Sequence, residues 1–221
     1  MKRLFDIIFS LLGLILLQPV LIIITIAIKV NSRGPIFFKQ KRVGRYGKPF
    51  ILYKFRSMTL FELAAEGLFQ PGNVSRVTSV GRFFRKSKLD ELPQLINVLI
   101  GDMSMVGPRP EVANWVAVYP DAWDIILTVR PGITDNASII FQDEESILAE
   151  VDDPEQVYRQ VILPRKLELY IDYVGNHSLF GDLMIILRTL KVLRLYERKP
   201  EDTIRESFSV QERIEVSKRG A

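Results

Sequence analysis

The chain of 221 residues contains no cysteine and a single histidine, His177. Without cysteine, the protein has no disulfide, no thiolate nucleophile and no cysteine-bound metal. One histidine also argues against a histidine-based catalytic triad and against a multi-histidine metal site. If the protein is an enzyme, its chemistry therefore depends on carboxylates, lysines, arginines, hydroxyl groups or a metal bound by oxygen.

The sequence also has no glycine-rich phosphate loop, no internal repeat and no low-complexity tract. Its charges nearly balance, since 30 basic and 26 acidic residues give a net charge of +4. This mild excess suits an anionic membrane surface or a phosphate-bearing ligand and does not by itself indicate nucleic acid. The length is sufficient for one compact domain with a small appendage.

Residues 4–28 form a long apolar segment. As a helix it would reach about 37 Å, enough to cross a hydrocarbon core of about 30 Å. Basic residues flank both ends, which the positive-inside rule would hold in the cytoplasm: Lys2, Arg3, Lys29 and Arg33. Gln18-Pro19 lies near the middle, where proline bends a helix. These features favour a re-entrant helix that returns to the face it entered, with a straight transmembrane span as the alternative.

Residues 35–58 alternate and are rich in strand-forming residues on both sides of a glycine-containing turn, which predicts a β-hairpin. The first half and tip of this hairpin are basic: Lys39, Lys41, Arg42, Arg45 and Lys48. These side chains form either a solvated face or a surface that attracts lipid headgroups or a diphosphate.

An adjacent pair of acids, Asp90 and Glu91, follows a segment (59–86) that we expect to be helix or loop with a break at 70–73. The end of that segment is basic: Arg76, Arg82, Arg85 and Lys86. After the acids, apolar residues recur at helical spacing: Leu92, Leu95, Ile96, Leu99 and Ile100. This predicts a core-facing helix that begins near Asp90, with Pro93 in its first turn, and stops at Gly101.

Two interpretations of the acid pair remain open. Acids at a helix start commonly act as caps. Alternatively, one is a nucleophile and the other binds a metal, because the same helix end favours an incoming phosphate. A glycosidase dyad is a poor fit, since adjacent residues of a helix cannot flank a glycosidic bond.

Arg109 lies between two prolines in residues 107–110, so its backbone is restricted on both sides. A fixed guanidinium suits bidentate phosphate binding, and a surface arginine on a turn is the alternative. Residues 130–134 form a second arginine-proline turn. Residues 135–160 are acidic, which indicates a solvated helical face in preference to a metal cluster. The pattern of 179–198 predicts a helix that lies in the membrane interface or packs on the core.

Taken together, the patterns predict an α+β fold that is mainly helical, with a re-entrant membrane helix, a small β-hairpin and amphipathic interfacial helices. We expect a membrane anchor at 1–33, a catalytic domain at 34–199 and a mixed-charge tail at 200–221.

The sequence resembles the monotopic phosphoglycosyl transferases, bacterial sugar transferases that start membrane-linked glycan assembly. The resemblance rests on blocks that occur in family order over about the first 135 residues: 2–6, the apolar segment with its central proline, 34–40, 53–58, 89–95, 101–104, 106–110 and 130–134. No multi-helix segment precedes them, so the chain resembles the small, catalytic-core form of the family.

The resemblance implies a two-step transfer. The carboxylate of Asp90 attacks the β-phosphate of a UDP-sugar and releases UMP. Undecaprenyl phosphate then accepts the phosphosugar, which gives an undecaprenyl-diphosphate sugar. Asp90 and Glu91 are the expected Mg²⁺ site, and the expected substrate-binding residues are Arg85, Arg109, Lys54, Arg56 and Arg130.

The same resemblance implies a location at the bacterial inner membrane, with the catalytic domain facing the cytoplasm. Membrane lipid and a second copy of the chain are candidate partners, and no nucleic acid is expected. The chain departs from many family members at Asp135-Asn136-Ala137-Ser138, where they have a glycine and an aromatic-glutamine pair. The identity of the sugar is therefore not predicted. The alternative function is a non-catalytic, membrane-anchored adaptor that binds anionic lipid or a partner.

Overall fold

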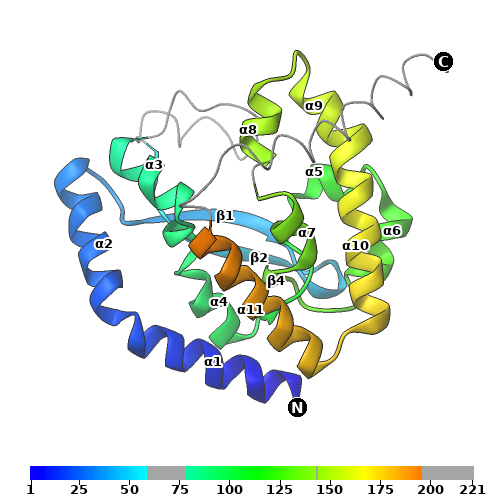
Figure 1. Ribbon diagram of the computed structural model, residues 1–221, viewed down its shortest axis with the longest axis horizontal. Coiled ribbons are helices and arrows are strands. Elements are labelled where there is room, and N and C mark those ends of the chain that lie inside the picture. Colours follow the sequence, from blue (N-terminus) through cyan, green and yellow to red (C-terminus); the bar gives the residue numbers. More distant parts are fainter. Residues whose placement is uncertain (59–77, 143, 196–221) are drawn as a thin grey trace.

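The computed structural model describes residues 1–58, 78–142 and 144–195 (Figure 1). Within these residues the fold is mainly helical, with four strands in two separate two-stranded sheets. This confirms the predicted α+β class. The expectations for 59–77, including the break at 70–73 and Arg76, and for the tail at 200–221 lie outside the described residues.

The apolar segment forms two helices, α1 (Lys2–Leu16) and α2 (Gln18–Asn31), which differ in direction by 61°. Pro19 occupies the first turn of α2, where its missing N–H costs no hydrogen bond, so the helix breaks at Leu17. We call this pair the arm. In Figure 1 the arm forms an L, and the rest of the described chain lies inside its angle. Neither arm helix alone has the length and apolar content of a membrane span, nor has any other helix in the described ranges, whereas the bent pair taken together has them.

Polar side chains of α1 tie the start of the arm to the domain. Lys2 Nζ donates to the carbonyl of Val106 (3.0 Å) and pairs with Asp182 (2.5 Å). Arg3 donates to two carbonyls at the end of α4 (Gln94–Ile100). Asp6 Oδ1 accepts from Ser104 Oγ and the backbone N–H of Met105, both at 2.9 Å. Two of the four basic residues expected to orient the segment, Lys2 and Arg3, are thus also bonded to the folded domain.

The other end of the arm is tied down by Arg56. Its guanidinium donates to the carbonyls of Ser32 and Arg33 and to the Ser32 hydroxyl, each at 2.8 Å. Since Arg56 directly follows a strand of the hairpin, both ends of the arm are bonded to the same folded unit.

The predicted hairpin is present. Strands β1 (Phe37–Val43) and β2 (Pro49–Phe55) pair antiparallel, and Arg45–Gly47 forms a short 3₁₀ turn between them. The outer edge of β2 is bonded by Asn97 of α4, whose amide donates to the carbonyl of Ile51 (2.7 Å) and accepts from the N–H of Tyr53 (3.0 Å). This side chain replaces a strand partner and fixes α4 against the sheet.

A second, parallel pair of strands was not predicted. It consists of β3 (Ser104–Val106) and β4 (Gly132–Thr134). Gly107 and Gly132 are in backbone contact, because a Cβ built on Gly132 would lie 2.1 Å from the nitrogen of Gly107. The pair therefore brings the two arginine-proline turns together.

The helix expected to begin near Asp90 begins later. Helix α3 (Ser79–Lys86) is followed by a 3₁₀ turn at Leu89–Glu91, and α4 starts at Gln94. Pro93 has no N–H, so the preceding turn is held by bonds to the third residue back, such as Leu92 N–H to Leu89. The predicted core stripe is also partly wrong, since Ile100 is 60 % exposed. The predicted stop at Gly101 is confirmed by its left-handed φ of 103°.

The remaining helices, other than α11, contribute to a core that contains Trp115, Trp123 and Tyr170. Their bounds are α5 (Ala113–Val116), α6 (Pro120–Ile126), α7 (Asn136–Ile140), α8 (Glu144–Ala149), α9 (Pro154–Val157), a π-helical turn at Tyr158–Ile162, α10 (Leu163–Asn176) and α11 (Leu179–Leu195). Helix α11 packs through the buried Ile185 in a separate cluster with Val106 and Tyr173. It leaves a row of apolar side chains exposed: Phe180, Leu183, Leu187 and Leu190. The packing alternative predicted for this helix therefore holds for one face, and the other face is apolar and uncovered.

Candidate active site

Asp90 and Glu91 lie in the 3₁₀ turn between α3 and α4, and both are buried. Lys88 sets up this turn with a positive φ of 55°, which is uncommon for a residue other than glycine. Neither acid caps a helix, since neither this turn nor α4 has a side-chain cap. Capping therefore does not explain the acid pair.

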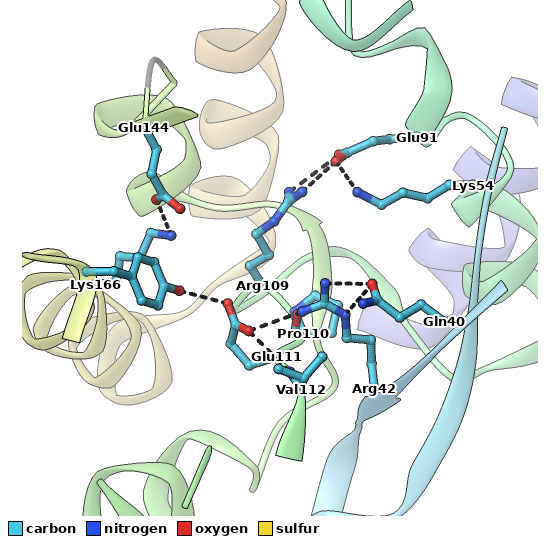
Figure 2. A network of polar contacts seen from close by, with 11 residues as sticks. Gln40, Arg42, Lys54, Glu91, Arg109, Pro110, Glu111, Val112, Glu144 and Lys166 are labelled. Carbon is cyan, nitrogen blue, oxygen red and sulfur yellow. Dashed lines mark hydrogen bonds and ion pairs between the residues drawn. The ribbon is translucent and has the colours of Figure 1, made fainter. Parts of the chain in front are cut away.

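Glu91 is held between two cations (Figure 2). Its Oε1 accepts from Lys54 Nζ at 2.8 Å and from Arg109 Nη2 at 2.5 Å. Burial alone would raise the pKa of Glu91, but these two cations outweigh it and hold the pKa well below its usual range. The same pairing raises the pKa of Arg109. Glu91 is therefore ionised, and it joins the hairpin to the proline-arginine turn.

Asp90, unlike Glu91, has a carboxylate oxygen that is not hydrogen-bonded. Its Oδ1 is buried and has no hydrogen-bond partner. Burial raises the pKa of Asp90 to about 6; the charge of Lys54 opposes the rise and that of Glu91 adds to it. Lys88 and Arg85 also lie close enough to lower this pKa. Asp90 is thus a poorly solvated carboxylate next to three cations, which is a suitable environment for a nucleophile that meets an anionic substrate.

Hydrogen bonds from the hairpin and from Tyr158 hold the loop that carries Arg109. Glu111 accepts from Arg42 (3.1 Å) and from the hydroxyl of Tyr158 (2.9 Å), and Arg42 also donates to the carbonyl of Pro110 (Figure 2). Gln40 in turn accepts two bonds from Arg42. This network holds the backbone next to Arg109, so the guanidinium reaches Glu91 from a restrained position.

Two expected substrate-binding residues lie in structural contacts. Arg56 is 3 % exposed, and its guanidinium donates hydrogen bonds to carbonyl groups at the end of the arm. Arg130 donates from Nε to the carbonyl of Gly101 at 2.9 Å. The structure thus brings together Asp90, Glu91, Lys54, Arg85 and Arg109, and it does not place Arg56 among them. Substrate binding by Arg56 and Arg130 stays a prediction.

The acidic stretch 135–160 is not solvated throughout. Asp135 is buried and caps α7, accepting from the N–H (2.8 Å) and hydroxyl (2.6 Å) of Ser138. Glu144 is paired with the buried Lys166 of α10. No group of three or more acidic or histidine side chains in the described part of the chain is arranged to hold a metal ion. The departure at Asp135 and Ser138 is therefore a helix cap.

Sequence reasoning gave no role to Asn97, Arg42, Lys88 or Tyr158. Asn97 occupies a helix face that the apolar pattern placed away from the core. Arg42 was included only as part of a basic hairpin. Tyr158 lies in a segment without a recognised motif. A buried polar network of this kind forms from residues far apart in sequence, so local spacing carries little signal for it.

An acid pair among cations, on a domain joined to an apolar arm, is a site that suits an anionic ligand. The comparison with known families is more specific: the family described as bacterial sugar transferase matches residues 1–195, and the chain belongs to this family. This confirms the family that the sequence was found to resemble.

Several relatives of the chain are named as transferases that use undecaprenyl phosphate. It is 40 % identical over 192 residues to a UDP-glucose:undecaprenyl-phosphate glucose-1-phosphate transferase of Klebsiella pneumoniae, covering 86 % of this chain and 39 % of that protein. It is 38 % identical over 208 residues to an undecaprenyl-phosphate galactose phosphotransferase of Salmonella typhimurium, covering 87 % and 40 %. The sugar transferase EpsL of Bacillus subtilis, uncharacterized by its name, is 40 % identical over 198 residues, covering 89 % of both chains.

Proposed function

We propose that this protein transfers a sugar phosphate from a UDP-sugar to undecaprenyl phosphate through a covalent intermediate on Asp90. The observation that carries the proposal is the buried, unpartnered Oδ1 of Asp90 beside Lys54, Arg85 and Lys88. The names of the relatives supply the substrate classes. The product, an undecaprenyl-diphosphate sugar, would begin the membrane stage of a bacterial glycan.

The chemistry is two displacements at one phosphorus. A carboxylate oxygen of Asp90 bonds to the β-phosphorus of the donor, and the bond between this phosphorus and the oxygen bridging to the α-phosphate breaks, so UMP leaves with the electron pair. An oxygen of the lipid phosphate then attacks the same phosphorus, and Asp90 leaves as a carboxylate. Lys54, Arg85 and Arg109 supply positive charge where negative charge accumulates.

Within this pair of steps Glu91 has a positioning role. Because its carboxylate pairs with both Lys54 and Arg109 in the absence of substrate, it keeps both cations at the site. A diphosphate that arrives there is a stronger partner for the two cations than water is, since charge-assisted bonds to phosphate are among the strongest hydrogen bonds in proteins.

Mg²⁺ is proposed as the cofactor, and the residues fit it in part. Proteins usually hold Mg²⁺ with one or two carboxylates together with substrate phosphates and water. The unpartnered oxygen of Asp90 is available as one ligand, whereas Glu91 already contacts two cations. When bound, the ion would neutralise charge on the diphosphate.

The arm is proposed to be re-entrant at the inner membrane, with the domain on the cytoplasmic face. Lys2, Arg3 and Asp6 bond the start of the arm to the domain, and Arg56 bonds its end to the same domain. A helix that crossed the bilayer would separate these two ends by the full hydrocarbon thickness of about 30 Å. The shared anchorage supports entry and exit at one face, and the apolar face of α11 suits the same interface.

The test is UMP release from a panel of UDP-sugars by the full chain in nanodiscs that contain undecaprenyl phosphate and Mg²⁺. The relatives are named for different sugars, so the panel includes UDP-glucose, UDP-galactose and UDP-N-acetylgalactosamine. We expect Asp90→Asn to abolish UMP release and to remove the sugar-phosphate adduct seen by mass spectrometry of the intact protein.

The matched control is Asp124→Asn, an exposed acid of α6, which should retain wild-type turnover. Wild-type activity in Asp90→Asn would disprove the assignment of the nucleophile. An adduct that persists on another residue in that variant would do the same.

A further inference from the structure

A buried polar cluster lies where the start of the arm meets the start of α11 (Figure 1). It consists of Lys2 of α1, Tyr173 of α10 and Asp182 of α11, and we call it the polar cluster. The carboxylate of Asp182 is buried and joins the other two residues. Its Oδ2 pairs with Lys2 Nζ at 2.5 Å, and its Oδ1 accepts from the hydroxyl of Tyr173 at 2.8 Å. No step of the proposed reaction uses these three side chains.

The polar cluster converges on one backbone oxygen, the carbonyl of Val106. Lys2 Nζ and the Tyr173 hydroxyl each lie 3.0 Å from this oxygen. Lys2 has three N–H donors, and each has a partner: this carbonyl, Asp182, and the oxygen of Tyr173 at 3.2 Å. Burial raises the pKa of Tyr173, and the charge of Asp182 adds to the rise, so the hydroxyl keeps its proton. The arm and α10 therefore hold the same carbonyl group.

The backbone between Val106 and Arg109 is stiff. Val106 is the last residue of β3 and lies three positions before Arg109. Between them, the N–H of Gly107 donates to the carbonyl of Thr134 at the end of β4 (3.1 Å). The two prolines that flank Arg109 restrict the backbone further. A displacement of the Val106 carbonyl is therefore passed on to Arg109, because few torsions between them can absorb it.

Helix α11 supports both short strands from one face. Asp182, Ile185 and Thr189 follow one another at spacings of three and four residues, which places them on the same side of the helix. Ile185 packs with Val106, and the Thr189 hydroxyl lies 2.6 Å from that of Thr134. The exposed apolar row lies on the rest of this helix. The two elements proposed to contact the membrane, the arm and α11, thus meet at the strand that leads to the arginine of the site.

We propose that the polar cluster positions Arg109: Lys2, Tyr173 and Asp182 hold the carbonyl of Val106 and, through the stiff loop, the guanidinium. This inference rests on the proposed function and gives the arm a second role. The arm is part of the scaffold of the active site as well as its membrane anchor. Its seating on the domain sets the place at which the guanidinium meets the diphosphate of the donor.

Two variants test this positioning role, Lys2→Met and Tyr173→Phe. The single-turnover rate of UMP release at saturating UDP-sugar, per folded protein, should fall about tenfold in Lys2→Met, because a small misplacement of a substrate-binding group slows the chemical step by that order. Tyr173→Phe keeps the bond from Lys2, so a loss of about threefold is expected.

The same two changes are then made in an Arg109→Lys background, which keeps the charge and removes the planar fork. There each should cost less than about twofold, since the group that they position has been removed. Residues that only anchor the arm would lower the stability of the fold and cost the same factor in both backgrounds. Equal factors in the two backgrounds therefore overturn the positioning role.

The matched controls remove similar groups elsewhere. Lys29→Met takes a basic residue from the other end of the arm, where its Nζ donates to the carbonyl of Gly34 at 3.0 Å. Tyr119→Phe removes a hydroxyl that donates to the carbonyl of Arg159, also at 3.0 Å. Both controls should keep the rate of their background. A tenfold loss in Lys29→Met would attribute the effect to the charge of the arm and overturn the role of the Val106 carbonyl.

Hydrogen exchange measured by mass spectrometry in nanodiscs examines the loop without the reaction. Lys2→Met and Tyr173→Phe should raise the exchange rate of the backbone amides in 104–112 about tenfold and leave the hairpin at 37–55 unchanged, because only the loop loses a support. Unchanged exchange at 104–112 in both variants overturns the inference. If no UDP-sugar gives UMP with the wild type, the proposed function fails, while hydrogen exchange still decides whether the polar cluster holds the loop.

Discussion

At the scale of single residues, Asp90 and Glu91 share one turn and differ in their surroundings. Two cations bond Glu91, whereas an oxygen of Asp90 is buried without a partner. Their pKa values consequently move in opposite directions. Two neighbouring carboxylates with separated pKa values are typical of sites where each carboxylate has its own role. We assign attack to Asp90 and the holding of the cations to Glu91.

The pH dependence of UMP release should follow the ionisation of Asp90. Its carboxylate attacks only when ionised, and burial raises its pKa to about 6. The initial rate should therefore fall as pH drops through about 6, by about tenfold per unit below it. Lys54 lowers this pKa, so Lys54→Met should move the acid limb to higher pH.

Pre-steady-state UMP release between pH 5 and pH 8 measures this limb. Lys41→Met, which removes an exposed lysine of the same hairpin, should leave the limb in place. A wild-type rate that stays constant down to about pH 5 would contradict an Asp90 pKa raised from its ordinary value of about 4.

Some residues of this site could be predicted from the sequence, but their contacts could not. Arg109 and the acid pair were found from local motifs, because adjacent acids and flanking prolines are visible within a few positions. Lys54 was expected at the site only from the family resemblance. The ion pairs of Glu91 with Lys54 and Arg109 were not predicted, since these residues lie 37 and 18 positions from Glu91. The choice between capping and catalysis depended on those partners, so spacing alone left it open.

At the scale of secondary structure elements, β3 and β4 hold the two arginine-proline turns together. Three-residue strands show no alternation that a sequence pattern can detect, whereas each strand of the hairpin has seven residues and was predicted. Gly107 directly follows β3, and Gly132 is the first residue of β4. Their backbone contact explains why both positions are glycine. Neither glycine has room for a side chain.

Gly132→Ala should therefore destabilise the protein and displace Arg109. The added methyl would lie 2.1 Å from the nitrogen of Gly107, and overpacking of this kind costs about 1–3 kcal/mol. Thermal unfolding in detergent micelles measures the loss. Gly175→Ala, in α10 with nothing within 4 Å of the new methyl, should instead stabilise the helix by about 0.5–1 kcal/mol. Equal melting temperatures for the two variants would contradict this account of β3 and β4.

At the scale of the whole molecule, hydrogen bonds at both ends join the arm to the domain, which lies inside the angle of the arm (Figure 1). The bend at Leu17 was predicted within one residue, because proline has a strong local effect on a helix. The bonds from Lys2, Arg3 and Asp6 to the domain were not predicted. Basic residues beside an apolar segment are also what membrane orientation alone requires, so the sequence could not reveal their second role.

The absence of native cysteine allows a direct test of topology. A cysteine inserted after Met1 and a separate Arg33→Cys variant place one thiol at each end of the arm. A membrane-impermeant maleimide should label both in inverted inner-membrane vesicles and neither in intact spheroplasts. Labelling of the amino-terminal cysteine in spheroplasts would contradict the re-entrant arm.

Lys2 and Asp182 are an ion pair although 180 positions separate them. At a synthesis rate of roughly 5–20 residues per second, Lys2 emerges roughly ten to forty seconds before its partner exists. Until residues 94–105, which bond Arg3 and Asp6, are also made, α1 has no domain surface to pack against, and a bilayer would be the solvent that accepts its apolar side chains. If the arm enters a membrane as proposed, the order of translation favours its insertion first, followed by a domain that folds onto an arm already in place.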